Sequence, residues 1–141
     1  MTGSGGVATK TPEAKHIFGP TILCRSGAYF DFDDPESSRF TIEDVAHGLS
    51  NICRFTGQCR YFYSVAEHSV HASHIVPPEF AFEALMHDAP EAFIGDVAKP
   101  LKNLLPDYRH VEGRVERAVL ARYGLSLPMS EPVKLADLRM L

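Results

Sequence analysis

Apolar residues recur with helical spacing over most of the chain and form strand-like runs only near its start. Residues 17–34 hold two such runs, TILCR and YFDF, and Ser26-Gly27 lies between them. Short apolar runs joined by turn residues predict a β-hairpin. After residue 40, capping residues, prolines and glycines divide the sequence into helical segments. The pattern therefore predicts an all-α fold, a helical bundle, with a short β-hairpin near the N-terminus.

Capping and breaking residues set the expected helix boundaries. A capping-box-like start at Thr41 predicts a helix to about Arg54, and the S-x-x-E box at Ser64 opens a helix that Pro77 must end. Short connections predict antiparallel or steeply crossed neighbours. Further helices are expected from Pro78 to about Pro90, over 91–94, over 99–105 with Asp96 as a cap, over 107–123 with Asp107 as a cap, and from Ser130 onward.

Polar side chains fall on the apolar faces of three of these helices. His68 shares a face with Val65, Ala72 and Ile75, the adjacent pair His87-Asp88 ends the next helix on its core side, and Asp137 aligns with Val133. Each has an ordinary explanation by itself. A buried histidine usually bonds to a carbonyl, Asp88 could cap a helix, and Asp137 could pair with a basic residue.

The joint pattern favours a different explanation. An inward carboxylate is costly unless it is neutralised, paired or bound to a cation. Two imidazoles and two carboxylates from three helices form a mixed nitrogen and oxygen set that suits a divalent metal. The absence of thiolates from the set is typical of a catalytic rather than a structural site. His71 and His74 lie off the apolar line and are expected on the flank or surface.

Composition narrows the class of function. Fourteen basic and 18 acidic residues give a net charge of −4, which argues against a general nucleic-acid binder but allows a local basic pocket for a phosphate ester. Three cysteines without a CxxC pair, Cys24, Cys53 and Cys59, argue against a disulfide framework and favour a reducing cytoplasm. No apolar run is long enough for a membrane span. Residues 1–16, rich in Gly, Ser and Thr, are expected to form a disordered arm.

The order His68, His87-Asp88, Asp137 resembles the H…HD…D signature of the HD-domain metal-dependent phosphohydrolase superfamily. The stretches SVAEHSV, ALMHDAPEAFIGDVAKPLK and KLADLRML are similar to those of the bacterial 5′-deoxynucleotidase-like HD hydrolases, and so is HGLSNICRFTGQ upstream. The likeness covers residues 20–141. It implies an HD-domain helical bundle over 17–141 and a truncated C-terminal part, because the last helix of the family normally continues past the final ligand.

The resemblance also implies a ligand set and a substrate pocket. One divalent metal ion (Mn, Co, Fe, Ni, Zn or Mg) would be held by the four signature residues His68, His87, Asp88 and Asp137. Glu91, in HDxxE, would help activate water; its alternative is an exposed glutamate at a helix start.

The same likeness assigns the substrate contacts. Arg54 would contact phosphate, Phe55 would shape the sugar pocket where the relatives carry tryptophan, and Asp96 would approach a sugar hydroxyl or cap a helix. Lys99 and Lys102 are further candidates for phosphate.

The implied function is a cytoplasmic metal-dependent phosphomonoesterase that releases phosphate from 5′-(deoxy)nucleoside monophosphates. Its partner would be a small-molecule nucleotide or phosphate ester, with no nucleic acid and no membrane, and a homodimer is one expectation because HD relatives often dimerise. Three alternatives stay open: an HD phosphodiesterase or triphosphohydrolase for another nucleotide, a nucleotide- or phosphate-binding regulatory module without turnover, and a structural domain whose metal supports folding. Ala92 stands where ppGpp hydrolases carry an acidic residue, which disfavours that chemistry.

Overall fold

The computed structural model describes residues 19–141, and it is mostly helical with one hairpin. Strands β1 (Thr21–Leu23) and β2 (Tyr29–Asp31) pair antiparallel, as the apolar runs predicted. The predicted arm over residues 1–16 lies outside the described residues. The helices that follow are α2 (Ile42–Ser50), α3 (Val65–Ile75), α4 (Ala81–Met86), α5 (Glu91–Ile94), α6 (Lys99–Lys102), α7 (Pro106–Arg122) and α8 (Glu131–Arg139), with short 3-10 turns at η2 (Pro35–Ser37), η3 (Arg54–Gly57) and η4 (Pro78–Phe80).

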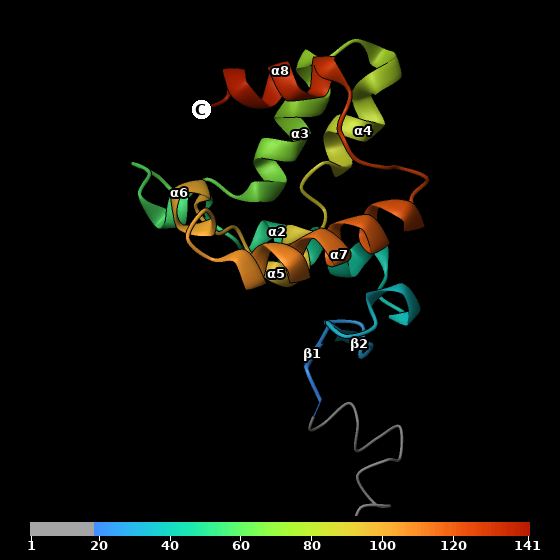
Figure 1. Ribbon diagram of the computed structural model, residues 1–141. Coiled ribbons are helices and arrows are strands. Elements are labelled where there is room, and N and C mark those ends of the chain that lie inside the picture. Colours follow the sequence, from blue (N-terminus) through green and yellow to red (C-terminus); the bar gives the residue numbers. More distant parts are fainter. Residues whose placement is uncertain (1–18) are drawn as a thin grey trace, which may run out of the picture.

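The helices lie in two groups (Figure 1). Helices α3, α4 and α8 pack together at one end of the molecule, and α2, α5 and α7 lie beside them, nearer the hairpin. No helix in the described part of the chain is long and apolar enough to cross a bilayer.

An aromatic core joins the hairpin to the group of helices α2, α5 and α7. Phe30 of β2 is fully buried and stacks on Phe93 of α5 with ring centroids 4.1 Å apart. Phe40, which precedes α2, packs against both rings. The guanidinium of Arg122, at the end of α7, lies over the Phe40 ring and donates to the Ser38 and Phe40 carbonyls. The contacts of Arg122 therefore hold the end of α7 against the segment that precedes α2.

Small side chains form a second, separate core between α3, α4 and α8. Its buried members are alanines and valines: Ala72, Val76, Ala84, Val133 and Ala136. Small side chains allow helices to approach closely, but each buries little apolar area. This core therefore has smaller buried side chains than the aromatic core, to which Val65 of α3 and Met86 of α4 also contribute.

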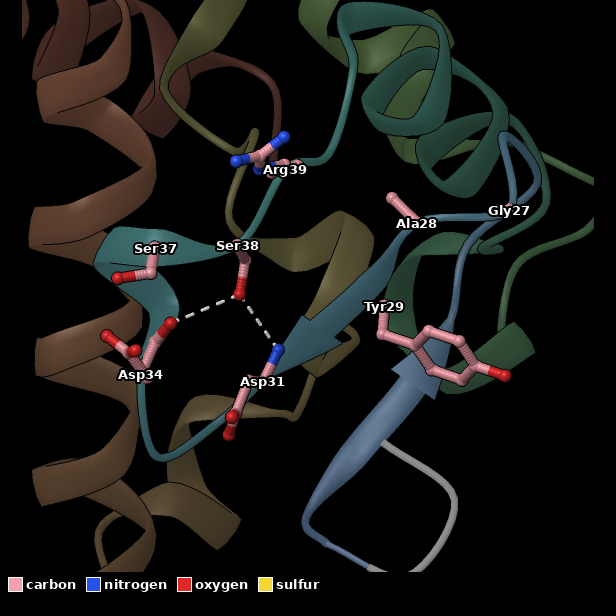
Figure 2. A pocket seen from close by; sticks show the side chains of 8 residues that line it. All are labelled: Gly27, Ala28, Tyr29, Asp31, Asp34, Ser37, Ser38 and Arg39. Carbon is pink, nitrogen blue, oxygen red and sulfur yellow. Dashed lines mark hydrogen bonds between the residues drawn. The ribbon is translucent and has the colours of Figure 1, made fainter. Parts of the chain in front are cut away.

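A cavity of about 310 Å³ opens between the hairpin and η2, apart from the signature residues. Figure 2 shows how Ser38 closes one side of it: its hydroxyl accepts from the Asp31 amide at 2.9 Å and donates to the Asp34 carbonyl at 3.2 Å. These bonds fix η2 against β2, so the cavity is a consequence of how the hairpin joins the bundle.

Several predicted helix boundaries, and one predicted inward position, are wrong. Helix α2 ends at Ser50 rather than near Arg54, because the Asn51 side chain donates to the His47 carbonyl and leaves the helical path. The α4 helix ends at Met86 rather than continuing to Pro90. Ile75, placed on the inner face of α3, is 46% exposed.

Two predicted caps are also wrong. Asp96 does not cap α6, whose N-cap is Ala98, and Asp107 does not cap α7, whose N-cap is Leu105. In both helices a proline stands in the first turn, where its missing N–H removes one of the donors that a cap would satisfy. The predicted caps of α2 and α3 are confirmed: Thr41 and Asp44 form a reciprocal capping box, and Ser64 accepts from the Glu67 amide.

Candidate metal centre

Three separate segments bring the four signature side chains together. His68 sits in the first turns of α3 and is fully buried. His87 and Asp88 follow α4 in tight turns, because Pro90 has no N–H for the Met86 carbonyl and the Ala89 amide takes that carbonyl instead at 2.9 Å. Asp137 lies near the end of α8.

The start of α8 is anchored to α4 by one carboxylate. Both carboxylate oxygens of Glu83 accept hydrogen bonds from Ser130, from its amide at 2.5 Å and from its hydroxyl at 2.7 Å. Ser130 is therefore the N-cap residue that the sequence predicted, although its hydroxyl donates to Glu83 instead of capping the helix. This contact fixes the helix that carries Asp137 relative to the one that leads to His87.

The ligand atoms of the quartet (His68, His87, Asp88 and Asp137) all lie within 4.8 Å of one another. The Nε2 atoms of the two histidines are 3.3 Å apart. Oδ1 of Asp137 is 2.9 Å from His68 Nε2 and 3.3 Å from His87 Nε2. Oδ2 of Asp88 is 3.4 Å and 3.2 Å from the same two nitrogens.

The tautomer of His87 makes this arrangement suitable for a cation. Its Nδ1 donates to the Ala84 carbonyl at 2.5 Å, so the neutral ring presents the Nε2 lone pair to the quartet. A backbone carbonyl that orients a ligating imidazole in this way is usual at metal sites. Two nitrogen and two carboxylate oxygen ligands fit a divalent metal with open coordination positions. The residues present could therefore hold such an ion.

Without a metal, protons must satisfy the same atoms. Burial lowers the pKa of His87, but hydrogen bonds to Asp137 and Asp88 outweigh it and raise the pKa to about 11. Hydrogen bonds from His68 and His87 hold the pKa of Asp137 well below its usual range. Burial raises the pKa of Asp88, but hydrogen bonding and the charge of His87 outweigh it and lower the pKa overall. The quartet therefore favours positive charge at its centre, which protons supply without metal and which a metal ion would supply when bound.

Glu91 lies directly beside the quartet. Its amide donates to the Asp88 carbonyl at 2.9 Å, which puts the two side chains one turn apart, as the sequence predicted. Burial, followed by the negative charges of Asp88 and Asp96, raises the pKa of Glu91 to about 10. Its Oε1 is buried with no hydrogen-bond partner among residues 19–141. Glu91 is therefore a half-buried residue with a buried carboxyl oxygen beside the quartet, and not the exposed helix-start glutamate of the alternative.

A cavity of about 610 Å³ opens over Asp88, Glu91 and Asp137. The three predicted substrate residues, Arg54, Phe55 and Asp96, line it together with Lys99 and Lys102. Arg54 is 7% exposed, donates to the Met140 carbonyl at 3.2 Å and lies over the Phe55 and Tyr63 rings. Burial and the charge of Asp88 raise the pKa of Asp96. The lining of the cavity therefore carries both basic and acidic side chains.

The loop that carries Arg54 is held in a strained conformation. Phe55 and Thr56 have φ of 58° and 56°, in the left-handed region, where a residue with a Cβ costs roughly 1–2 kcal/mol. The Arg54 amide donates to the Tyr63 carbonyl at 2.8 Å, and Cys53 and Ser64 form a β-bridge, so the base of the loop is closed. Strain of this kind often accompanies a functional site.

Two features of the cavity were missed by sequence reasoning. Lys102 forms a 2.6 Å ion pair with Glu112 of α7, which is 9% exposed, and Arg109 of α7 also lines the cavity. Glu112 and Arg109 are three residues apart and so share a helix face. The spacing of these two charged residues could have indicated a functional face of α7, but it did not show that Lys102 would lie opposite that face.

Comparison with known proteins gives relatives but no activity. No family model matches the chain. The chain is homologous to "Uncharacterized protein YfdR" of Escherichia coli, with 53% identity over 116 residues that make up 82% of this chain and 65% of that protein. It is 36% identical over 121 residues to "Uncharacterized protein RCAP_rcc00048" of Rhodobacter capsulatus, an alignment that covers 79% of this chain and 62% of that protein. The chain thus spans slightly less than two thirds of the length of these relatives.

Proposed function

We propose that the protein is a metal-dependent phosphohydrolase, a phosphomonoesterase that acts on 5′-(deoxy)nucleoside monophosphates. The observation that carries the proposal is the convergence of the quartet within 4.8 Å, with two of its members, Asp88 and Asp137, lining a cavity that basic side chains also line. The resemblance to the HD superfamily names the same four residues as ligands. One divalent ion would be held by His68, His87, Asp88 and Asp137.

A divalent ion bound there would supply Lewis-acid stabilisation of phosphate charge and lower the pKa of water. Glu91 is the side chain placed to hold the proton that the attacking water loses. Its pKa of about 10 applies to the arrangement without metal, and a nearby dication would lower it toward the range of a general base. A positioned base of this kind contributes about 10²–10⁴-fold to the rate.

The basic side chains that line the cavity would bind the phosphate, and the rest of the cavity would hold the nucleoside. The Arg54 guanidinium offers a planar set of donors suited to phosphate oxygens, and Lys99 adds positive charge, while the charge of Lys102 is shared with Glu112. Phe55 is 42% exposed beside Arg54 and offers an apolar face to the sugar or base. Asp96 is a candidate acceptor for a sugar hydroxyl.

The test is phosphate release by chain stripped of metal with a chelator and then reloaded with Mn²⁺ or Co²⁺. The panel holds 5′-deoxynucleotides, 5′-ribonucleotides, 3′-nucleotides and p-nitrophenyl phosphate. We expect metal-dependent release from the 5′-monophosphates. If the loaded protein hydrolyses none of these compounds, the proposal is wrong.

Substitution of Glu91 separates turnover from binding. Glu91→Gln should lower kcat by about 10²–10⁴-fold while metal is still bound, because the base is lost but the quartet is intact. Glu79→Gln, at an exposed position in η4 away from the cavity, is the matched control and should leave kcat unchanged. Tight nucleotide binding with equal, negligible turnover in wild type and Glu91→Gln would indicate a regulatory binding module instead.

A further inference from the structure

The loop between α2 and α3 carries two cysteines whose thiols meet. Cys53 stands at the base of the loop, in the β-bridge with Ser64, and Cys59 follows six residues later. Their sulfur atoms are 3.2 Å apart, and both residues are partly exposed. The left-handed turn over Phe55, Thr56 and Gly57 reverses the chain between them and brings the two thiols together.

We propose that Cys53 and Cys59 form a reversible disulfide, a redox modification site beside the cavity. The bond needs the sulfurs to approach from 3.2 Å to about 2.0 Å. Of the intervening residues, 55–58 are exposed and only Arg54 is buried, so most of this loop can move without disturbing a packed core. Cys24, by contrast, packs against the aromatic core and has no thiol partner among residues 19–141.

The oxidant is a small disulfide such as glutathione disulfide. One protein thiolate attacks it, forms a mixed disulfide and releases one glutathione thiolate. The second protein thiolate then attacks the protein sulfur of the mixed disulfide and releases the second glutathione. The two cysteines lose two electrons and two protons in total, and the glutathione disulfide gains them. Because hydrogen bonding to Cys53 raises the pKa of the Cys59 thiol, the exchange is faster above neutral pH.

The modification would act on the substrate pocket, and this consequence rests on the proposed function. Arg54 and Phe55 lie inside the ring that the disulfide closes, and both line the cavity over the quartet. Drawing the sulfurs together moves the segment that holds the Arg54 guanidinium. A displacement of about 1 Å at a substrate contact can cost about 10²-fold in rate. We therefore expect the oxidised form to hydrolyse phosphate esters more slowly.

Peptide mapping tests the bond directly. The full chain is incubated at pH 8 in glutathione redox buffers, its remaining thiols are alkylated in denaturant, and it is digested with trypsin without reductant. Trypsin cuts after Arg39, Arg54 and Arg60, which puts the two cysteines on different peptides, 40–54 and 55–60. The expected product is these two peptides joined by a disulfide, with Cys24 alkylated. Dithiothreitol should separate them.

Cysteine variants provide the controls. Cys24→Ser should still give the linked peptides, and Cys59→Ser should give only a mixed disulfide of glutathione with Cys53. The proposal is overturned if wild-type protein accumulates mixed disulfides without the internal bond, or if Cys24 is a partner in the linked product.

The kinetic consequence has its own readout. Oxidation should lower the rate of p-nitrophenyl phosphate hydrolysis by metal-loaded wild type by about tenfold or more, and dithiothreitol should restore it, whereas Cys59→Ser should not respond. An active protein whose disulfide forms without a rate change would disprove the link to Arg54. A protein that forms the disulfide but hydrolyses nothing would refute the proposed function and leave the redox site standing.

Discussion

The two cores of the molecule are built in opposite ways. The core beneath the hairpin contains Phe30, Phe40 and Phe93, whose rings contact one another at centroid distances of 4.1–5.8 Å. The buried members of the core between α3, α4 and α8 are alanines and valines, and the partly buried Phe80, Met129 and Met140 pack against them. Beside it lie the four polar side chains of the quartet. Buried aromatic rings dominate the first region, whereas the second combines small apolar side chains with a cluster of polar groups that either protons or a cation can satisfy.

The largest effect should come from the aromatic core. Phe30→Ala removes a fully buried ring that stacks on Phe93, and we expect it to lower the free energy of unfolding by about 3–5 kcal/mol in urea titrations. Phe62→Ala, at a residue that is 65% exposed, is the control and should change the free energy of unfolding by less than about 0.5 kcal/mol. A loss below about 1 kcal/mol for Phe30→Ala would show that this core does not dominate stability.

The second region should respond to metal instead. Free Mn²⁺ at 100 times its Kd should stabilise the folded chain by about 2.7 kcal/mol, provided that it does not bind the unfolded chain. Asp88→Asn keeps the shape of the side chain but removes the charge, so this gain should vanish. Phe30→Ala should keep this gain, because Phe30 supplies no ligand to the quartet. Equal stabilisation of wild type and Asp88→Asn would mean that the ion binds elsewhere.

A smaller effect is expected where α2 crosses α5. A Cβ added at Gly48 would lie 2.9 Å from the Ala92 carbonyl oxygen, which is backbone and cannot rotate away. Gly48→Ala should cost about 1 kcal/mol net, because overpacking of about 1–3 kcal/mol is partly offset by the better helix propensity of alanine. Gly113→Ala in α7 is the matched control, since its Cβ would meet only the Arg117 side chain at 3.3 Å. That variant should be neutral or slightly more stable in the same urea titration.

The sequence was informative wherever local rules decide the structure. The Thr41 and Ser64 caps, the hairpin and the inward position of His68 all follow from spacing and capping chemistry, and all are confirmed. The four ligand positions could be predicted because polar residues on apolar stripes are conspicuous. That prediction extends only to a cluster that could hold a metal, and the substrate roles of Arg54, Phe55 and Asp96 stay predictions.

Tertiary contacts explain what the sequence could not indicate. The left-handed turn at Phe55 and Thr56 contradicts the local preference of both residues and depends on the bridge between Cys53 and Ser64. The Lys102–Glu112 ion pair joins segments whose relative placement no periodicity predicts. The proximity of the two thiols belongs to this same loop, whereas the missed end of α2 has a local cause, the hydrogen bond from the Asn51 side chain to the His47 carbonyl.

The finest distinction between the two regions is their response to pH. The pKa of His87 is about 11 in the folded, metal-free protein and about 6.5 when unfolded. Its contribution to stability is therefore complete below pH 6.5 and is lost as pH rises toward 11. The pKa of Asp137 is lowered, so its contribution is present above about pH 4 and is lost as pH falls below that value. Because the Asp137 side chain is 48% exposed, solvent weakens both effects.

Bound metal should change this pH dependence, because it binds the neutral imidazole of His87 and displaces its proton. Stabilisation by metal should therefore increase as the pH rises, whereas stabilisation by the protonated His87 decreases. The Tm of metal-free protein should therefore fall between pH 7 and pH 10, while the rise in Tm on adding Mn²⁺ grows over the lower part of this range. His87→Gln should flatten the metal-free profile, and His71→Gln, at an exposed residue outside the quartet, should leave it unchanged. Differential scanning calorimetry at several pH values measures both curves. A metal-free Tm that rises with pH in this interval would show that the quartet is not held together by shared protons.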